Sequence, residues 1–420
     1  MITLIEALNY RCLRYIHQPL KPFHVLVGPN ASGKTTFLDI VSFLETLVSN
    51  GLDAAISGRT HNFQDLIWRR SETDRFFELA IEAQIPEKLK ELLGKNSYDT
   101  VRYEVRIGEN EHGETIIQSE KALLKYKQPD KSYQRTLFPV LREVPGTIMT
   151  PKKVKKYRTI INKVLGGNDN FYSELYRGPG KGWAPSFKLG PHKSALGNLP
   201  EDKSKFPVTS WLKGVLTAGV QQFVLNSMLI RKASPPGQSR TFKPDGSNLP
   251  WVINRLKEVS PDRYRDWIAH LQTALPDLQD IQTIERSDDK HRYVVLCYQG
   301  SLKVPSWMAS DGTLRLLALT LPAYLTDFEG IYLIEEPENG IHPQAVETMY
   351  QSLSSVYDAQ ILLATHSPVI LSLAKPEDVL CFAKTPEGAT DIVLGIEHPR
   401  LRDWRGETNL GTLFAGGVLS

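Results

Sequence analysis

The sequence is poor in cysteine, with only Cys12, Cys297 and Cys381, which lie far apart in the chain. No two of them form a Cys-x-x-Cys pair, so the sequence offers neither a common zinc-binding pattern nor a disulfide framework. We expect three free thiols, which is typical of proteins in a reduced, cytoplasmic environment.

The sequence also lacks long hydrophobic runs and a strong charge of either sign. No stretch of about 18 apolar residues occurs, which argues against a membrane-spanning helix. The N-terminal residues lack the basic and then apolar pattern of a signal peptide. The net charge is only +3, so no overall positive field indicates nucleic acid as a partner. The hydrophobic content of 41% is ordinary for a globular protein, and we expect a cytoplasmic protein without membrane contacts.

One glycine-rich segment stands out from this ordinary composition. Residues 28–35, Gly-Pro-Asn-Ala-Ser-Gly-Lys-Thr, match the Walker A phosphate loop, G-x-x-x-x-G-K-T. Apolar residues 23–27 predict a strand before the loop, and the apolar spacing after it predicts a helix, whose N-terminus is suited to bind phosphate. We therefore predict that Lys34 contacts the β- and γ-phosphates of ATP and that Thr35 coordinates Mg²⁺. The other predicted nucleotide-binding residues of this loop are Asn30, Gly33 and Thr36.

A second motif begins with the apolar residues 331–334, which predict a buried strand that ends in Glu335 and Glu336. Carboxylates at the end of a buried strand are costly unless a cation or a proton donor uses them. We predict that Mg²⁺ and an attacking water use the carboxylates of Glu335 and Glu336. Another apolar strand over 360–365 precedes His366, for which we predict contact with the γ-phosphate, the alternative being a structural histidine.

Three further candidates are weaker when taken singly. Ser310 and Gly312 open an apolar helix, where Ser310 should act as the N-cap and leave N–H groups free for an anion; an ordinary helix cap is the alternative. Arg11 could reach a nucleotide phosphate, although a solvated surface arginine fits equally well. Gln64 lies between the two halves of the motif set and could bind Mg²⁺ and the attacking water.

The residues in the middle of the chain predict strands, helices and loops, but they contain no motif to which we can assign a chemical role. Alternating residues over 75–84, 100–107 and 115–127, with a hairpin turn at 108–113, predict an antiparallel β-layer. Helical spacing is expected over 208–230 and 261–275. Residues 177–207 are rich in glycine, proline, lysine and serine and predict a long mobile loop that could bind a partner. The basic run at 151–158 could contact nucleic acid, although such runs are more often solvated surface.

The motifs taken as an ordered set resemble the ABC-type ATPase head shared by SMC, RecF and overcoming-lysogenisation-defect (OLD) proteins. Residues 333–343 are similar to the Walker B and D-loop of the OLD class, and residues 310–315 resemble its signature motif. The resemblance implies that Glu335 contacts Mg²⁺, that Glu336 is the catalytic base and that His366 senses the γ-phosphate. It also implies that Ser310 and Gly312 contact ATP held by a second subunit.

Several features depart from these families. Glu335 stands where many heads carry aspartate, and the signature reads Ser-Asp-Gly-Thr in place of the Ser-Gly-Gly-Gln of transporters. There is no zinc-hook Cys-x-x-Cys and no long heptad run, which argues against a long-armed repair ATPase. The chain after His366 is shorter than the roughly 100 residues of a domain, so we expect no Toprim nuclease domain there and an ATPase that is not itself a nuclease.

These observations predict an α/β fold: an ABC-type P-loop NTPase head with an antiparallel β-layer and an inserted, mainly helical region. We expect half-heads over residues 1–140 and 276–420 and the insert over 141–275. The predicted function is ATP hydrolysis in a homodimer or higher homo-oligomer, as a switch that gates a separate effector protein, for example a nuclease, in prokaryotic anti-phage defence. A RecF-like DNA-repair ATPase is the alternative, and contact with nucleic acid stays open.

Overall fold

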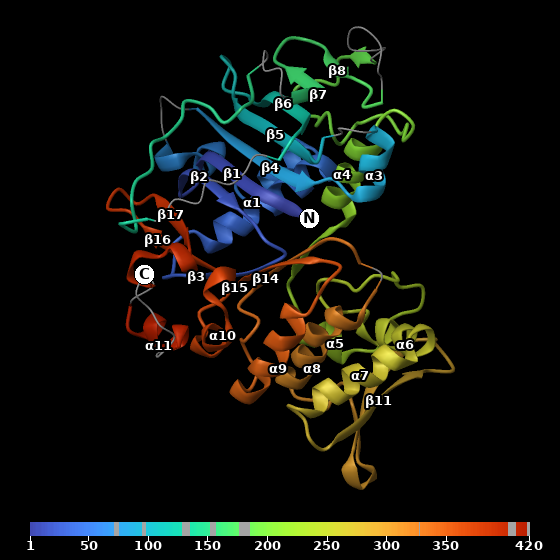
Figure 1. The fold of residues 1–420 in the computed structure, drawn as a ribbon. Helices are drawn as coiled ribbons and strands as arrows, with labels where there is room; N and C mark the ends of the chain where they lie inside the picture. Colours follow the sequence, from blue (N-terminus) through green and yellow to red (C-terminus); the bar gives the residue numbers. More distant parts are fainter. Residues whose placement is uncertain are drawn as a thin grey trace.

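The computed structural model describes residues 1–70, 75–94, 98–127, 135–151, 157–175, 185–326, 328–401 and 409–417. These residues form three β-sheets with helices packed between and around them. Figure 1 shows two lobes, an upper one built on antiparallel strands and a lower one rich in helices, with β3, β14 and β15 between them.

The central sheet carries the two main sequence motifs. Its strand order is β10-β14-β15-β3-β16-β17, and all neighbours are parallel except β17, which runs antiparallel to β16. The carboxyl ends of the parallel strands therefore meet at one edge of the sheet. The strands are β3 (Phe23–Val27), β10 (Val220–Phe223), β14 (Ile331–Glu335), β15 (Gln360–Ala364), β16 (Val379–Lys384) and β17 (Thr390–Leu394).

Both faces of the central sheet are buried, which explains its apolar sequences. Side chains alternate between the faces along each strand. Leu26 of β3 packs in the upper hydrophobic core, whereas its neighbours Val25 and Val27 pack in the lower one. The upper core includes α1 (Lys34–Asn50), and the lower core includes α8 (Asp311–Thr320), α9 (Pro343–Ser354) and α10 (Pro368–Leu373).

The predicted antiparallel β-layer is confirmed as an eight-stranded sheet in the upper lobe. Its order is β2-β1-β4-β5-β6-β7-β8-β9. Val101, Tyr103 and Val105 of β5 belong to the same core as α1, so the helix is buried between the two sheets. The strands are β1 (Ile2–Tyr10), β2 (Leu13–Pro19), β4 (Phe76–Gln84), β5 (Thr100–Glu109), β6 (Thr115–Lys125), β7 (Tyr157–Val164), β8 (Asp169–Phe171) and β9 (Ser186–Phe187).

The opposite face of this β-layer is charged and still buried. Arg102 pairs with three carboxylates, at 2.8 Å from Glu6, 3.2 Å from Glu82 and 2.7 Å from Glu104. The Arg102 guanidinium also donates to the carbonyl oxygen of Ile148, from the segment that covers this face. Because every partner charge lies within hydrogen-bond distance, the buried cation is compensated.

The lower lobe adds helices and a small antiparallel sheet. Trp267 of α7 is fully buried there and donates its indole N–H to the hydroxyl of Thr320, at 2.9 Å. None of the described helices is long and apolar enough to cross a membrane. The elements of this lobe are α5 (Ser227–Arg231), α6 (Leu249–Val259), α7 (Pro261–Gln272), β11 (Leu278–Glu285), β12 (Arg292–Tyr298) and β13 (Lys303–Pro305). The other α-helices among the described residues are α2 (Leu52–Ser57), α3 (Glu87–Leu93), α4 (Pro207–Ala218) and α11 (Leu410–Ala415).

The α/β fold class is confirmed, but the helical part of the predicted insert is narrower than 141–275. Strands β7, β8 and β9 extend the antiparallel sheet, so residues 157–171 and 186–187 continue the β-layer. The helix expected over 208–230 is wrong as a continuous element, because α4 ends at Ala218 and β10 then pairs with β14. Pairing with a neighbouring strand overrides local helical spacing. The division into three domains stays a prediction.

The segment expected to be a mobile loop, 177–207, is largely anchored where the structure describes it. Leu196 and Leu199 are buried in the upper core. The fully buried Glu120 of β6 accepts hydrogen bonds from Ser194 Oγ (2.8 Å), the Leu196 N–H (2.8 Å) and Tyr103 Oη (2.9 Å). Burial raises the pKa of Glu120. Residues 176–184 and the basic residues 152–156 lie outside the described part of the chain.

We predict that Glu120→Ala destabilises the upper lobe, because it leaves buried donors of the 194–196 turn without an acceptor. An unsatisfied buried group costs about 1–3 kcal/mol, so we expect a loss of about 3 kcal/mol in the free energy of unfolding, measured by chemical denaturation. Glu91→Ala, at an exposed site on α3, is the control and should change it by less than about 0.5 kcal/mol. Equal stability of the two variants would contradict the anchoring role.

Candidate functional site

The phosphate loop connects β3 to α1, and its glycines are required by close packing. A Cβ atom on Gly28 would lie 2.2 Å from the carbonyl oxygen of Phe382. At Gly33, where φ is +104°, a Cβ would lie 2.4 Å from Thr390 Oγ1. That hydroxyl donates to the Ser32 carbonyl at 2.8 Å, so strand β17 supports the loop from behind. The sequence analysis did not identify Thr390, because a single threonine in a strand carries no signal.

The side chain of Lys34 lies over its own loop. Its Nζ donates to the carbonyl oxygens of Gly28 at 2.8 Å and Pro29 at 3.0 Å. Burial lowers the Lys34 pKa to about 8, and the nearby carboxylates of Glu336 and Glu335 oppose this shift. The ammonium is therefore mostly protonated at pH 7 and available to an anion at the loop.

Two of the three predicted magnesium ligands, Thr35 and Glu335, meet at the edge of the central sheet. Thr35 Oγ1 donates to Glu335 Oε2 at 2.5 Å, although the two residues come from opposite ends of the chain. Hydroxyl and carboxylate oxygens suit Mg²⁺, which prefers hard oxygen ligands. The Ser32 hydroxyl in the same loop is buried without a hydrogen-bond partner among the described residues. These residues fit a magnesium–phosphate group, with Thr35 and Glu335 as the metal ligands.

Glu336 follows directly after β14 in a backbone conformation that is unusual for its residue type. Its φ of +45° lies in the left-handed region, which costs energy for any residue with a Cβ and occurs preferentially at functional sites. The Glu336 N–H donates to the Ala364 carbonyl at 2.8 Å, and Asn339 Nδ2 donates to Glu336 Oε2 at 2.6 Å. The exposed carboxylate is thus held in a defined position beside Glu335.

His366 lies at the end of the neighbouring strand β15, and its backbone N–H is bound by Glu338, a residue that the sequence analysis left without a role. Glu338 Oε1 accepts from Thr365 Oγ1 at 2.6 Å and from the His366 N–H at 3.2 Å. Burial and, secondarily, the Lys34 charge lower the pKa of His366. The imidazole is therefore neutral at pH 7. Glu338 could have been predicted from the sequence, because it is the third acidic residue of the Glu-Glu-Pro-Glu segment.

The signature segment lies in the other lobe. Ser310 Oγ accepts from the Thr313 N–H at 3.1 Å and caps α8, which confirms the predicted N-cap. A Cβ on Gly312 would lie 2.5 Å from the Gly340 carbonyl, so the start of α8 packs tightly against the turn that follows Glu336. Figure 1 places α8 among the lower helices and α1 in the upper lobe.

Three of the remaining candidates have contacts with residues other than Thr35 and Glu335. The Arg11 guanidinium is 3.3 Å from the carboxylate of Asp39 on α1. Gln64 Nε2 donates to Glu109 Oε1 at 3.0 Å and is thus engaged on β5. Thr36 Oγ1 lies 3.5 Å from Cys12 Sγ, and Asn30 is exposed on the loop. Nucleotide contacts by Arg11, Gln64, Asn30 and Thr36 stay predictions.

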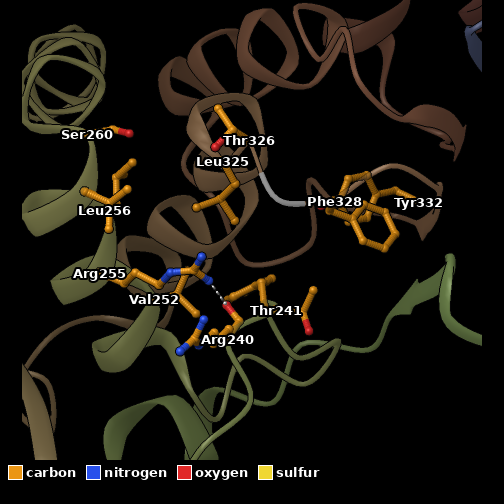
Figure 2. Close-up of a pocket in the computed structure, with 12 residues that line it drawn as sticks. Arg240, Thr241, Val252, Arg255, Leu256, Ser260, Leu325, Thr326, Phe328 and Tyr332 are labelled. Carbon is orange, nitrogen blue, oxygen red and sulfur yellow. Dashed lines mark hydrogen bonds between the residues drawn. The ribbon is translucent and has the colours of Figure 1, made fainter.

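A separate small cavity of about 30 Å³ lies in the lower lobe (Figure 2). It is bounded by α6 and by the segment that leads into β14, and Arg255 donates to the carbonyl of Arg240 across it. The described residues that line it include none of the predicted phosphate or metal ligands. We therefore place the candidate site at the strand ends and not in this cavity.

We predict that Gly312→Ala destabilises the protein, because the new methyl group would collide with the Gly340 backbone. Alanine otherwise stabilises a helix by about 1 kcal/mol relative to glycine. Gly214→Ala is the matched control, since Gly214 lies exposed in α4 and its added Cβ meets nothing within 4 Å. Thermal unfolding should show a lower Tm for Gly312→Ala and an unchanged or higher Tm for Gly214→Ala; a rise in both would contradict the close contact.

Comparisons with known proteins agree with this arrangement. Residues 23–372 match the family described as "AAA domain, putative AbiEii toxin, Type IV TA system". None of the curated proteins matches the chain in sequence.

Two solved structures of SMC heads are similar in fold. One is an SMC head bound to the C-terminal winged-helix domain of ScpA, with 12% identity, a TM-score of 0.52 and coverage of 93% of this chain and 96% of that one. The other is an SMC head with an extended coiled coil, bound to the C-terminal domain of ScpA from Pyrococcus furiosus. It has 12% identity, a TM-score of 0.51 and coverage of 93% and 95%. The chain has the fold of the SMC head, an ABC-type P-loop domain, and it belongs to the AAA-domain family whose model spans both of its motif regions.

Proposed function

We propose that this protein binds ATP with Mg²⁺ and hydrolyses it at the strand-end site. The observation that carries the proposal is the 2.5 Å contact between Thr35 Oγ1 and Glu335 Oε2. It joins the phosphate loop to the acidic strand end at the point where a metal-bound triphosphate needs both. Membership of a P-loop AAA family supports the same chemistry.

The position of each site residue indicates its role in binding or hydrolysis. Lys34 supplies a positive charge within the loop, and Thr35 and Glu335 supply oxygens to Mg²⁺, which neutralises charge on the phosphates when bound. Glu336 is the general base that orients and deprotonates the attacking water. Neutral His366, whose backbone N–H is bound by Glu338, donates a hydrogen bond to the γ-phosphate.

The site is completed by a second copy of the chain. The Ser310 cap and the free N–H groups at the start of α8 form an anion-binding end of a helix. Because α8 lies in the lower lobe, away from the start of α1, this end is available to ATP held by a partner. The proposed active unit is a head-to-head homodimer, or a higher homo-oligomer built from such dimers.

The proposed output is a change of shape that gates a separate effector, such as a nuclease, in anti-phage defence. The family description refers to a toxin of type IV toxin–antitoxin systems, which supports a defence role. The similar SMC heads engage a separate protein, ScpA, which is a precedent for such a partner. The acidic pair Asp288-Asp289 forms a turn between β11 and β12, with Asp289 paired to Arg286, and supports no nuclease centre. ATP hydrolysis stimulated by DNA would instead favour a RecF-like role.

We predict that one variant of the site loses ATP binding and that another loses only hydrolysis. Lys34→Ala should weaken ATP binding at least about tenfold by calorimetry, since a charge-assisted contact is worth more than about 1.4 kcal/mol. Glu336→Gln should keep ATP binding and slow hydrolysis by about 10² to 10⁴, because a general base is lost. Glu347→Gln, on the exposed side of α9, should leave both unchanged. If Glu335→Gln were the variant that binds but does not hydrolyse, the roles of the two carboxylates would be exchanged.

We predict complementation between two inactive variants if the site is shared between subunits. In a mixture of Lys34→Ala and Ser310→Arg chains, each mixed dimer has one intact phosphate loop facing one intact signature. Random pairing restores about a quarter of the sites of the symmetric dimer, so turnover should recover to that order in the mixture. Activity that stays at the level of the separate variants would count against the shared site.

A further inference from the structure

Three turns converge beside the phosphate loop, on the side away from the acidic strand. The turn between β1 and β2 is linked to the loop helix, with Cys12 Sγ 3.5 Å from Thr36 Oγ1. The Thr390 N–H donates to the Cys12 carbonyl at 3.0 Å, which brings the β16–β17 hairpin to the same place. The third turn contains Trp68 and Arg69 and is tied to the first by the Arg11 N–H, 2.9 Å from the Leu66 carbonyl.

The direction in which a bound phosphate chain would run indicates that its nucleoside end lies in this region. Thr35 faces Glu335 on β14, and β14 lies on the opposite side of β3 from β16 and β17. A triphosphate with its γ end at Glu335 therefore leaves the loop toward Thr36, Cys12 and the β16–β17 hairpin. The nucleoside end of the ligand arrives at the three turns.

Trp68 has the placement expected of a side chain that receives a ligand. Its side chain is half-buried, yet it belongs to none of the hydrophobic clusters formed by the described residues. The Arg69 guanidinium carbon lies 5.3 Å from the centre of the Trp68 ring. Arg69 also donates to the carbonyl oxygen of Glu387 at the tip of the β16–β17 hairpin. The indole and the guanidinium thus lie beside each other, and the guanidinium is bound to the hairpin whose Thr390 supports the loop.

The backbone around this pair is strained. Arg69 and Arg70 have φ values of +52° and +49°, and Arg11 opposite them has +50°. Residues with a Cβ rarely adopt this conformation, and where contacts hold them in it the position is often functional. Here the contacts of Arg11 with Leu66 and of Arg69 with Glu387 hold the turn against the loop.

We propose that Trp68 and Arg69 form the nucleoside subsite, in which the base of ATP stacks on the indole and the guanidinium lies beside it. Aromatic side chains bind any base through its π-face, and the arginine adds a cation–π contribution. The inference rests on the proposed ATP site and adds the surface that receives the part of the ligand beyond the phosphates.

The test compares ATP with inorganic tripolyphosphate, which has the phosphates but no base. Calorimetry on the full chain with Mg²⁺ gives the Kd of each. Trp68→Ala should weaken ATP binding about tenfold, the loss typical of one stacked base, and leave tripolyphosphate binding within about twofold. Trp68→Phe should retain most of the ATP affinity, because it keeps an aromatic face. Lys34→Ala should weaken both ligands.

The matched control is Trp251→Ala in the lower lobe, where Arg292 lies 4.7 Å from the centre of the indole ring. This variant removes a similar pair far from the loop and should change neither Kd. Equal losses for ATP and tripolyphosphate in Trp68→Ala would make Trp68 a structural support only, and no loss for either would exclude it from the site. Wild-type protein that binds neither ligand would instead overturn the proposed function itself, and the inference with it.

Discussion

The structure depends on the register of three neighbouring parallel strands. In that register Glu335 on β14 pairs with Ala364 on β15, and Ala364 pairs with Leu26 on β3. The residues that follow these three are an acid, a Thr-His pair and a glycine loop, so they meet at one edge of the sheet. A shift of one residue would turn alternate side chains to the other face and would separate Thr35 from Glu335. The apolar cores on both faces oppose such a shift.

The two cores also explain why the motifs occupy different lobes. Alternate residues of the same strands contribute to the upper core, with α1, and to the lower core, with α8 and α9. The phosphate loop therefore lies with the antiparallel sheet, whereas the signature helix packs beneath the central sheet. Because of this separation, the N-terminal end of α8 lies in a different lobe from the phosphate loop of its own chain. This is the physical basis for proposing that the site is shared between two chains.

The chemistry of the site follows from packing as much as from charge. Thr390 and Phe382 press against the loop so closely that only glycine fits at positions 33 and 28. Glu338 orients the backbone beside His366, and burial keeps that imidazole neutral. Strained residues gather near the same edge, at Glu336 on one side of the loop and at Arg11 and Arg69 on the other. The loop is thus bordered on both sides by conformations that the surrounding contacts maintain.

Local sequence determined the strands at 23–27 and 331–335, the glycine loop, the acidic pair and the Ser310 cap. Each of these depends on neighbouring residues alone, through apolar runs, glycine spacing or a capping side chain. Only the tertiary structure decided that residues 220–223 form a strand beside β14, that Glu120 and buried leucines anchor the 194–199 turn, and that Gln64 contacts Glu109. It alone decided, too, that Thr390 supports the loop and that Trp68 lies near it. These outcomes depend on partners far away in the chain, and their free energy comes from pairing and burial that no local pattern records.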